Sequence, residues 1–155
     1  MKRIALLALI ALPACDDLPI LASASGAVPS PAPVETLDPT PPPPPPPQAR
    51  TAEEFDTTSA EDRAAALATP EPAGEVALGT TVASLGSPAI PGIWMETPLV
   101  SALVMGRVEV DGRSVSLELR PSGGAAGSGS QISLAAMRLL EVPLTDLPVV
   151  TVYRQ

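Results

Sequence analysis

The sequence predicts a mainly β protein: a small β-barrel with one short helix, preceded by a signal peptide and a disordered, proline-rich linker. Three observations support this prediction. Two basic residues and a short apolar run stand near the start of the chain. Most of the 21 prolines follow, between Pro19 and Pro72. From Val76 onward, short alternating or β-branched runs are separated by turn residues, as in small β domains.

The first fourteen residues have the parts of an export signal. Lys2 and Arg3 are basic, residues 4–11 are apolar, and a small-residue segment leads to Cys15, the only cysteine in the chain. An apolar run of this length is too short for a hydrocarbon core about 30 Å thick, which needs about 20 residues. We therefore expect residues 1–14 to be a cleaved signal peptide rather than a membrane span.

This pattern resembles the bacterial lipoprotein signal, in which a diacylglycerol is attached to the cysteine thiol and the peptide is cut just before it. The resemblance implies that Cys15 is lipidated and that the protein is periplasmic and anchored in a lipid bilayer. Asp16 and Asp17 resemble the signal that keeps some lipoproteins in the inner membrane, but the choice between inner and outer membrane stays open. The alternatives are ordinary cleavage after the A-x-A pattern at 22–24, and an intermolecular disulfide or a reactive thiol at Cys15.

Residues 15–50 are predicted to form an acidic, proline-rich, disordered tether. Proline occupies every position from 41 to 47, and such a run lacks backbone donors and has a fixed φ, so it adopts a polyproline II rod. A rod of this kind is a spacer or, alternatively, a ligand for an aromatic groove. The acidity lies mainly in the first half: residues 16–75 carry a net charge of −9, and residues 76–155 a net charge of −1.

The composition argues against two classes of binding protein. Lys2 is the only lysine and the arginines are scattered, so the electrostatic pattern of nucleic-acid binding is missing. The aromatic residues are Phe55, Trp94 and Tyr153, too few to build stacking platforms for bases or long glycans. We therefore expect no nucleic-acid partner.

Residues 51–75 are predicted to form a marginal helical segment followed by a linker. Thr51-x-x-Glu54 and Ser59-x-x-Asp62 both resemble capping boxes, and the residues after the second box are rich in alanine. Apolar positions are few and mostly alanine, so the segment has little surface to bury. We expect it to dock loosely or not at all.

The clearest strand signal comes from residues 107–110 and 114–120. Apolar and polar residues alternate in both runs. Asp111 and Gly112 lie between them, and an Asp-Gly pair in this setting predicts a hairpin with a type I′ turn, because that turn needs positive φ at both central positions.

The remaining elements follow from composition and turn residues. Three further strands are expected, at residues 78–85, 92–100 and 149–153. The glycine- and serine-rich residues 121–130 are predicted to be a loop, and Ser133 to cap a helix that continues to residue 140. Five strands and one short helix predict a small β-barrel-like domain over residues 76–155.

The order of motifs in this domain is similar to that of a known family. It runs from the GRSV motif at 112–115 through an alternating strand, a glycine-rich loop and the helix at 132–140 to the terminal strand at 149–153. This order resembles the double-psi β-barrel of rare lipoprotein A and its expansin-like relatives. The resemblance implies a double-psi-like fold, with peptidoglycan as the partner that the domain binds or acts on.

The chain departs from the enzymes of that family at their general acid. They carry an aspartate in an Asn-Asp-Arg-Gly-Pro motif, whereas this chain has RPSGG at 120–124. Cleavage of a glycosidic bond generally needs a carboxylic acid, and commonly a second carboxylate. We therefore assign no catalytic residue and expect binding rather than cleavage.

A second resemblance concerns the TVASLG, WxxTPLV and SLAAMRLL segments at 81–86, 94–100 and 133–140. They are similar to small alphaproteobacterial envelope lipoproteins that are often labelled D-galactarate dehydratase. The dehydratases of that name are much larger, metal-dependent enzymes. This chain has no histidine, and its carboxylates do not have the spacing of a calcium loop. No metal and no cofactor are therefore expected.

Other candidate catalytic groups have simpler interpretations. Glu96, Glu109 and Glu118 lie in or near predicted strands, and the last two occupy polar positions of the hairpin that are expected to face solvent. The serines of the glycine-rich loop lack a histidine to act as base. We therefore assign no catalytic role to any of these carboxylates or serines.

Trp94, Arg113 and Arg120 are the candidate residues of a binding surface, with burial in the core as the alternative for Trp94. We expect a non-catalytic, membrane-anchored envelope lipoprotein that binds peptidoglycan or an envelope protein. The alternative is a glycan-cleaving or sugar-acid-processing enzyme with an atypical carboxylate site. A third hypothesis is a subunit of an envelope assembly whose partner completes the β edges of the domain.

Overall fold

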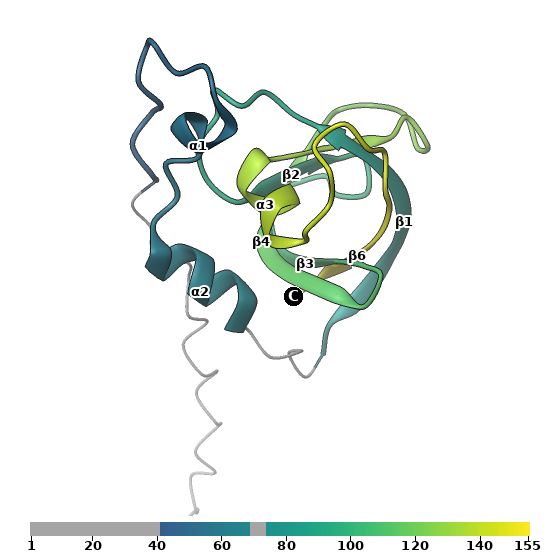
Figure 1. Ribbon diagram of the computed structural model, residues 1–155. Helices are drawn as coiled ribbons and strands as arrows, with labels where there is room; N and C mark the ends of the chain where they lie inside the picture. Colours follow the sequence, from purple (N-terminus) through teal and green to yellow (C-terminus); the bar gives the residue numbers. More distant parts are fainter. Residues whose placement is uncertain (1–40, 69–73) are drawn as a thin grey trace, which may run out of the picture. The chain divides into compact units, whose positions relative to one another are not determined.

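Six strands close into a barrel in the computed structural model, which describes residues 41–68 and 74–155 (Figure 1). The strands are β1 (Val76–Leu85), β2 (Trp94–Thr97), β3 (Val104–Val110), β4 (Arg113–Pro121), β5 (Ser130–Ile132) and β6 (Val149–Arg154). Three short helices accompany them: α1 (Ala52–Phe55), α2 (Ala60–Ala68) and α3 (Leu134–Leu139). This architecture confirms the predicted small, mainly β barrel.

Several predictions concern residues that the structure does not describe. The signal peptide at 1–14, the lipidated Cys15 and the tether up to residue 40 all lie outside the described residues. Those predictions therefore stay predictions. Among the helices of the described part, none has the length and hydropathy needed to cross a membrane.

The strand order around the barrel is β1-β5-β2-β4-β3-β6. The pairs β1–β5 and β2–β4 are parallel, and the other four are antiparallel. Parallel neighbours cannot be joined by a tight hairpin, so the chain crosses the barrel between them. If β1 is exchanged with β4, β2 with β5 and β3 with β6, the list of paired strands stays the same. The strand pairing of the barrel therefore has two-fold pseudosymmetry.

Each strand of the closed barrel has two neighbours from its own chain. The ladders cover only part of each strand: residues 76–82 of β1 pair with β6 alone, and residues 113–117 of β4 pair with β3 alone. The hypothesis that a partner completes the β edges of this domain therefore stays a prediction.

The predicted hairpin is present between β3 and β4. Val110 and Arg113 are register partners, and Asp111 and Gly112 between them have φ of 50° and 78°. These positive values are what a type I′ turn requires at both central positions. Glycine adopts them without strain, and aspartate is among the residues that tolerate them best.

Strand β5 is the element that sequence analysis missed. It has three residues and follows directly after the glycine-rich loop, whose end was predicted to extend to residue 130. The helix after it agrees with prediction: Ser133 is the N-cap of α3 and its side chain accepts a hydrogen bond from the backbone N–H of Ala136. The barrel thus contains one short helix, as expected, and six strands rather than five.

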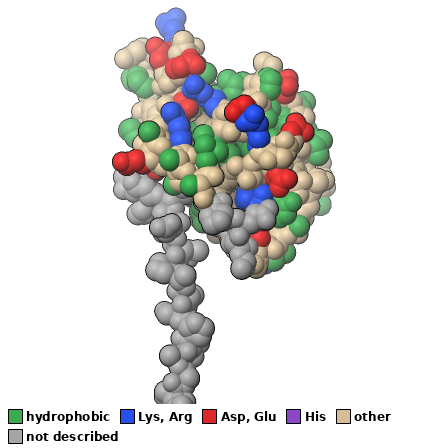
Figure 2. Space-filling model, turned by 60° about the horizontal axis from the view of Figure 1, so that its bottom comes forward, with side chains coloured by type: hydrophobic (Ala, Val, Ile, Leu, Met, Phe, Trp, Pro, Cys, Tyr) green, Lys and Arg blue, Asp and Glu red, His purple; other side chains and the backbone are tan. Residues whose placement is uncertain are grey.

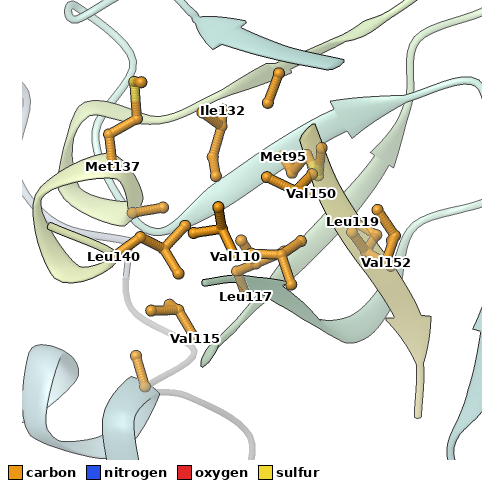
Figure 3. Close-up of a cluster of buried hydrophobic side chains, with 14 residues drawn as sticks. Met95, Val110, Val115, Leu117, Leu119, Ile132, Met137, Leu140, Val150 and Val152 are labelled. Atoms are coloured by element: carbon orange, nitrogen blue, oxygen red, sulfur yellow. The ribbon is translucent and has the colours of Figure 1, made fainter. Parts of the chain in front are cut away.

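The hydrophobic core lies inside the barrel and beneath α2 and α3 (Figure 3). Alternate residues of the strands point inward, as their period of two requires. The cluster comprises Ala66, Ala83, Met95, Val108, Val110, Val115, Leu117, Leu119, Ile132, Ala136, Met137, Leu140, Val150 and Val152. Burying a valine or leucine side chain fully stabilises a fold by about 1.5–3 kcal/mol, so this small cluster supplies much of the driving force for folding.

The helical segment before the barrel packs against it. Ala66 of α2 is 2% exposed and belongs to the core cluster. The carboxylate of Asp56 forms ion pairs with Arg63 at 3.0 Å and with Arg138 of α3 at 3.3 Å. The segment therefore packs on the barrel through Ala66 and through the carboxylate of Asp56, contrary to the expectation that it docks loosely or not at all.

The proline run at 41–47 also lies on the folded part of the chain. Pro42 and Pro45 are half-buried, whereas the other prolines of the run are exposed, which matches the three-residue turn of a polyproline II helix. The carbonyl oxygen of Pro43 accepts a hydrogen bond of 2.6 Å from the Thr57 hydroxyl. A Cβ placed on Gly92 would lie 3.7 Å from Pro42 and 4.0 Å from the Trp94 ring. One face of the run is therefore covered by the loop before β2.

Candidate functional site

A polar pocket of about 580 Å³ lies on the outside of the barrel over β1, β5 and β2. The glycine-rich loop between β4 and β5 borders it. Its lining consists of small and polar residues with two aliphatic side chains: Val82, Ser84, Glu96, Ser122, Gly124, Gly127, Ser128, Gly129, Ser130, Gln131 and Leu147. We take this pocket as the candidate functional site.

The base of the pocket is a row of three polar side chains on adjacent strands. Gln131 of β5 is the register partner of Ser84 on β1 and of Glu96 on β2. Neighbouring strands lie about 4.8 Å apart, so the three side chains are lateral neighbours. Their sequence neighbours Ala83, Met95 and Ile132 belong to the core, which places the row on the outer face. We call Ser84, Gln131 and Glu96 the polar row.

A chain of hydroxyl groups holds the three strands in place behind the row. The Ser130 hydroxyl donates to the Thr97 hydroxyl at 2.9 Å and lies 3.0 Å from the Thr81 hydroxyl. Ser84 donates to the backbone carbonyl of Ser130 at 3.3 Å. Thr97 and Ser130 are buried, and a buried hydroxyl without a partner would be costly, so these bonds favour one arrangement of β5. The short strand is thereby fixed beneath the pocket.

Glu96 is the carboxylate that lines the pocket, and it has no hydrogen bond or ion pair with any described residue. The two other strand carboxylates considered from the sequence differ from it. Glu109 is ion-paired with Arg107 at 2.9 Å, and Glu118 with Arg120 at 2.5 Å. The charge of Glu96 is therefore available to a ligand, whereas theirs are already matched.

The structure corrects the predicted role of Trp94. Its side chain is 1% exposed, so it cannot contribute to a binding surface. The indole N–H donates to the carbonyl of Ile90 at 3.2 Å, and the Arg120 guanidinium lies over the ring at 5.2 Å from its centroid. A Cβ on Gly86 would come within 2.6 Å of the ring. The ring thus lies on the outer face of β2, alongside Glu96, but is covered by the loop before that strand.

Arg113 and Arg120 do not form one surface. They lie at opposite ends of β4, and neither lines the candidate pocket. Arg113 is ion-paired with Glu141 and borders a second pocket of about 400 Å³ beside the hairpin, whereas Arg120 is bound to Glu118. Arg120 thus lies against Trp94, whereas Arg113 is at the far end of the strand, and the three residues do not form one binding surface.

Sequence analysis named one member of the polar row and missed the others. Glu96 was expected in or near a strand, with no catalytic role and no prediction of the face on which it lies. Gln131 was missed because β5 was not recognised, and Ser84 because nothing local distinguishes it from other strand serines. The signal available in the sequence was an acidic residue within the strand expected at 92–100.

The described residues contain no group of three or more His, Cys, Asp or Glu side chains placed to hold a metal ion. On the face of the molecule in Figure 2, acidic and basic side chains are interspersed rather than gathered into one basic patch. The pocket is thus a hydrogen-bonding site with one carboxylate. It offers hydroxyl groups, an amide and a negative charge to a small polar ligand.

Comparisons with protein-family models, with curated protein sequences and with solved structures found no match to this chain.

Proposed function

We propose that this protein is a membrane-anchored cell-envelope lipoprotein whose barrel binds peptidoglycan without cleaving it. The observation that supports this most is the pocket over β1, β5 and β2, which is lined by hydroxyl groups, an amide and one carboxylate. Peptidoglycan consists of sugars and short peptides rich in hydroxyl, amide and amino groups. A polar pocket of this kind matches those groups by hydrogen bonding.

The anchor of the proposed protein is an acylated Cys15, at the end of the lipoprotein-like signal. Several acyl chains on one residue give stable attachment to a bilayer, whereas a single chain gives only marginal binding. Residues 15–40 would then separate the membrane from the packed proline run. Fully extended at about 3.1 Å per residue, they span about 80 Å. This reach suits a barrel that contacts a cell wall at a distance from the membrane.

Binding can be tested with the full chain, purified in detergent, on isolated peptidoglycan sacculi. We expect the protein to be retained, and the Ser84→Ala/Gln131→Ala variant to be retained much less, because the polar row loses two of its three hydrogen-bonding groups. The control variant is Thr80→Ala/Ser87→Ala, which removes two exposed hydroxyls outside the pocket. Equal retention of all three proteins, or no retention of the natural chain, would contradict the proposal.

The anchor is tested separately in cells. Cys15→Ser should abolish labelling with a radioactive or clickable fatty acid and release the chain from the membrane fraction. Separation of inner and outer membranes would then show which one holds the acylated protein. Persistent acyl labelling of the Cys15→Ser variant would exclude this residue as the attachment point.

A second candidate function is cleavage of a glycan, and one observation favours it. Glu96 lies in the pocket without an ion-pair partner among the described residues, so it is placed to protonate a glycosidic oxygen. Against it, no other acidic side chain lines the pocket, and most glycoside hydrolases use two carboxylates. A zymogram on peptidoglycan distinguishes the two functions. Clearing by the natural chain that is lost in Glu96→Gln would favour cleavage over binding.

A further inference from the structure

Glu96 lines the pocket beside an arginine with which it forms no ion pair. Its register neighbour on β4 is a cation, Arg120. Arg120 nevertheless donates from Nε to Glu118, and its guanidinium lies over the Trp94 ring. No Glu96–Arg120 ion pair is formed within the described residues. The pocket therefore presents a carboxylate whose neighbouring cation is held elsewhere.

The remainder of the pocket lining is neutral. Serine hydroxyls and the Gln131 amide provide donors and acceptors, and none of the lining residues is a lysine or an arginine. An anionic ligand would thus meet a negative charge with no compensating cation. A ligand with a positive charge gains the attraction of Glu96 instead.

The pocket also has an aliphatic wall and lacks an aromatic one. Val82 and Leu147 line it, with exposures of 46% and 65%, and no aromatic side chain does. Sugar rings are commonly held by stacking on aromatic side chains, which this pocket does not provide. An aliphatic wall beside a carboxylate is instead suited to a short methylene chain that ends in an ammonium group.

We infer that the pocket binds an amino-bearing peptide, with its ammonium group on Glu96 and its aliphatic stem against Val82 and Leu147. This inference rests on the proposed function and makes it more specific: the barrel recognises the peptide stems of peptidoglycan, which carry free amino groups, rather than the glycan strands. Gln131, the lateral neighbour of Glu96, and Ser84, on the other side of Gln131 in the polar row, hydrogen-bond the amides of the peptide.

The test is an NMR titration of the full chain in detergent with two tripeptides whose N-terminal amine is blocked: Nα-acetyl-L-Ala-D-Glu-L-Lys, with a free lysine amine, and the same peptide acetylated also on Nε. We expect the free amine to shift backbone resonances of β1, β2 and β5, and the acetylated peptide to bind about tenfold more weakly because the charge-assisted bond is lost. Glu96→Gln should weaken binding of the free amine about five- to tenfold and remove the difference between the peptides. Glu61→Gln, an equal change of charge at an exposed position of α2, should have no effect.

Two arms distinguish this inference from the proposed function. Sacculi are acetylated on their free amines and used in the retention assay beside untreated sacculi. Equal retention on both, with equal binding of the two tripeptides, would overturn the ammonium assignment and leave peptidoglycan binding intact. Binding of the free tripeptide without retention on sacculi would support the ammonium assignment and contradict peptidoglycan binding. Absence of shifts at millimolar free tripeptide, or unchanged binding in Glu96→Gln, would also overturn the inference.

Discussion

Arg107 is a charged side chain that is only 3% exposed, although it occupies an outward position of β3. Its Nε and Nη2 donate to Glu75, Nη1 donates to Glu109, and its guanidinium lies 4.2 Å from the centroid of the Tyr153 ring. The hydrogen bonds to Glu75 raise the pKa of Arg107 above its ordinary value, so it stays charged wherever the protein is folded. One arginine thus joins the start of β1, β3 and β6.

Gly106 is the position in β3 where the absence of a side chain matters most. A Cβ there would come within 2.3 Å of a Leu119 methyl group and 2.4 Å of the Tyr153 carbonyl oxygen. We expect Gly106→Ala to destabilise the protein by about 1–3 kcal/mol, because overpacking a core forces side chains and backbone apart. Chemical denaturation followed by circular dichroism measures this change.

Gly124→Ala is the control for that substitution. Its Cβ would meet the hydroxyl of Ser128, an exposed side chain in the glycine-rich loop that is free to rotate away. We expect a change within about 0.5 kcal/mol, as is usual at surface positions. Equal destabilisation by the two variants would show that the loss of stability in Gly106→Ala does not come from the close contacts of Gly106 with Leu119 and Tyr153.

The stability of α1 is expected to depend on pH through Glu54. Its carboxylate accepts hydrogen bonds from the backbone N–H groups of Arg50 and Thr51, which lower the pKa of Glu54 below its ordinary value of 4.5. A lowered pKa in the folded state means that the capping box stabilises α1 above pH 4.5, and that this contribution is lost as the pH falls through the folded-state pKa.

An NMR titration of the Glu54 carboxyl resonance tests this prediction, with an unstructured glutamate-containing peptide as the reference. The amide protons of Arg50 and Thr51 should titrate together with Glu54, because they lose their acceptor at the same pH. A midpoint for Glu54 at or above that of an unstructured glutamate would contradict the capping arrangement.

At the scale of elements, the proline run behaves as part of the folded protein. Substituting Pro42 and Pro45 by alanine removes the two half-buried rings. Because Pro42 lies beside Gly92, which in turn lies beside the Trp94 ring, we expect the fluorescence of this single tryptophan to shift to longer wavelength and the ring to become more accessible to acrylamide. Pro44→Ala/Pro47→Ala, which changes two exposed rings at the same spacing, should leave the emission unchanged. Identical spectra for both double variants would mean that the run does not shield Trp94.

Helices and strands could be predicted from the sequence where they were long enough to show a local residue pattern. The β3–β4 hairpin was predictable because both its alternation and its turn chemistry lie within consecutive residues. β5 was not, because three residues cannot display a period of two, and its pairing with β1 and β2 depends on residues far away in the sequence. Docking of α2 was missed because Ala66 alone reaches the core, which is too little for a visible apolar stripe.

At the scale of the whole molecule, barrel closure depends on β6. This strand pairs with both β1 and β3, and its Val150 and Val152 belong to the core. A chain that stops after Pro148 would leave both neighbours with free edges and lose two buried valines, each of which stabilises by about 1.5–3 kcal/mol. We expect this truncation to abolish cooperative thermal unfolding.

Removal of Gln155 alone is the matching control. It deletes one hydrogen bond, from its backbone N–H to the Met105 carbonyl at 3.1 Å, which contributes about 1 kcal/mol. The shortened protein should keep a cooperative transition at a slightly lower temperature. A cooperative transition in the chain that ends at Pro148 would show that the barrel does not require its last strand.

The candidate site shows how much of a function can be inferred before the fold is known. The sequence placed Glu96 in or near a strand without predicting its face, and in the structure its side chain lines a pocket on the outer face of the barrel. What distinguished it from Glu109 and Glu118 was the partner of each: an arginine for the latter two and none among the described residues for Glu96. Alternation along a strand predicts the face of a side chain but not its neighbour on the next strand.

Local pattern was sufficient for the mainly β class, the Asp-Gly hairpin, the Ser133-capped helix and the last strand, because these depend on contacts between residues close in sequence. Only the closed barrel brings Ser84, Gln131 and Glu96 into one row. This row depends on pairings between strands that are distant in the chain. Such pairings are selected by the packing of the whole core, and no short segment of the sequence encodes them alone.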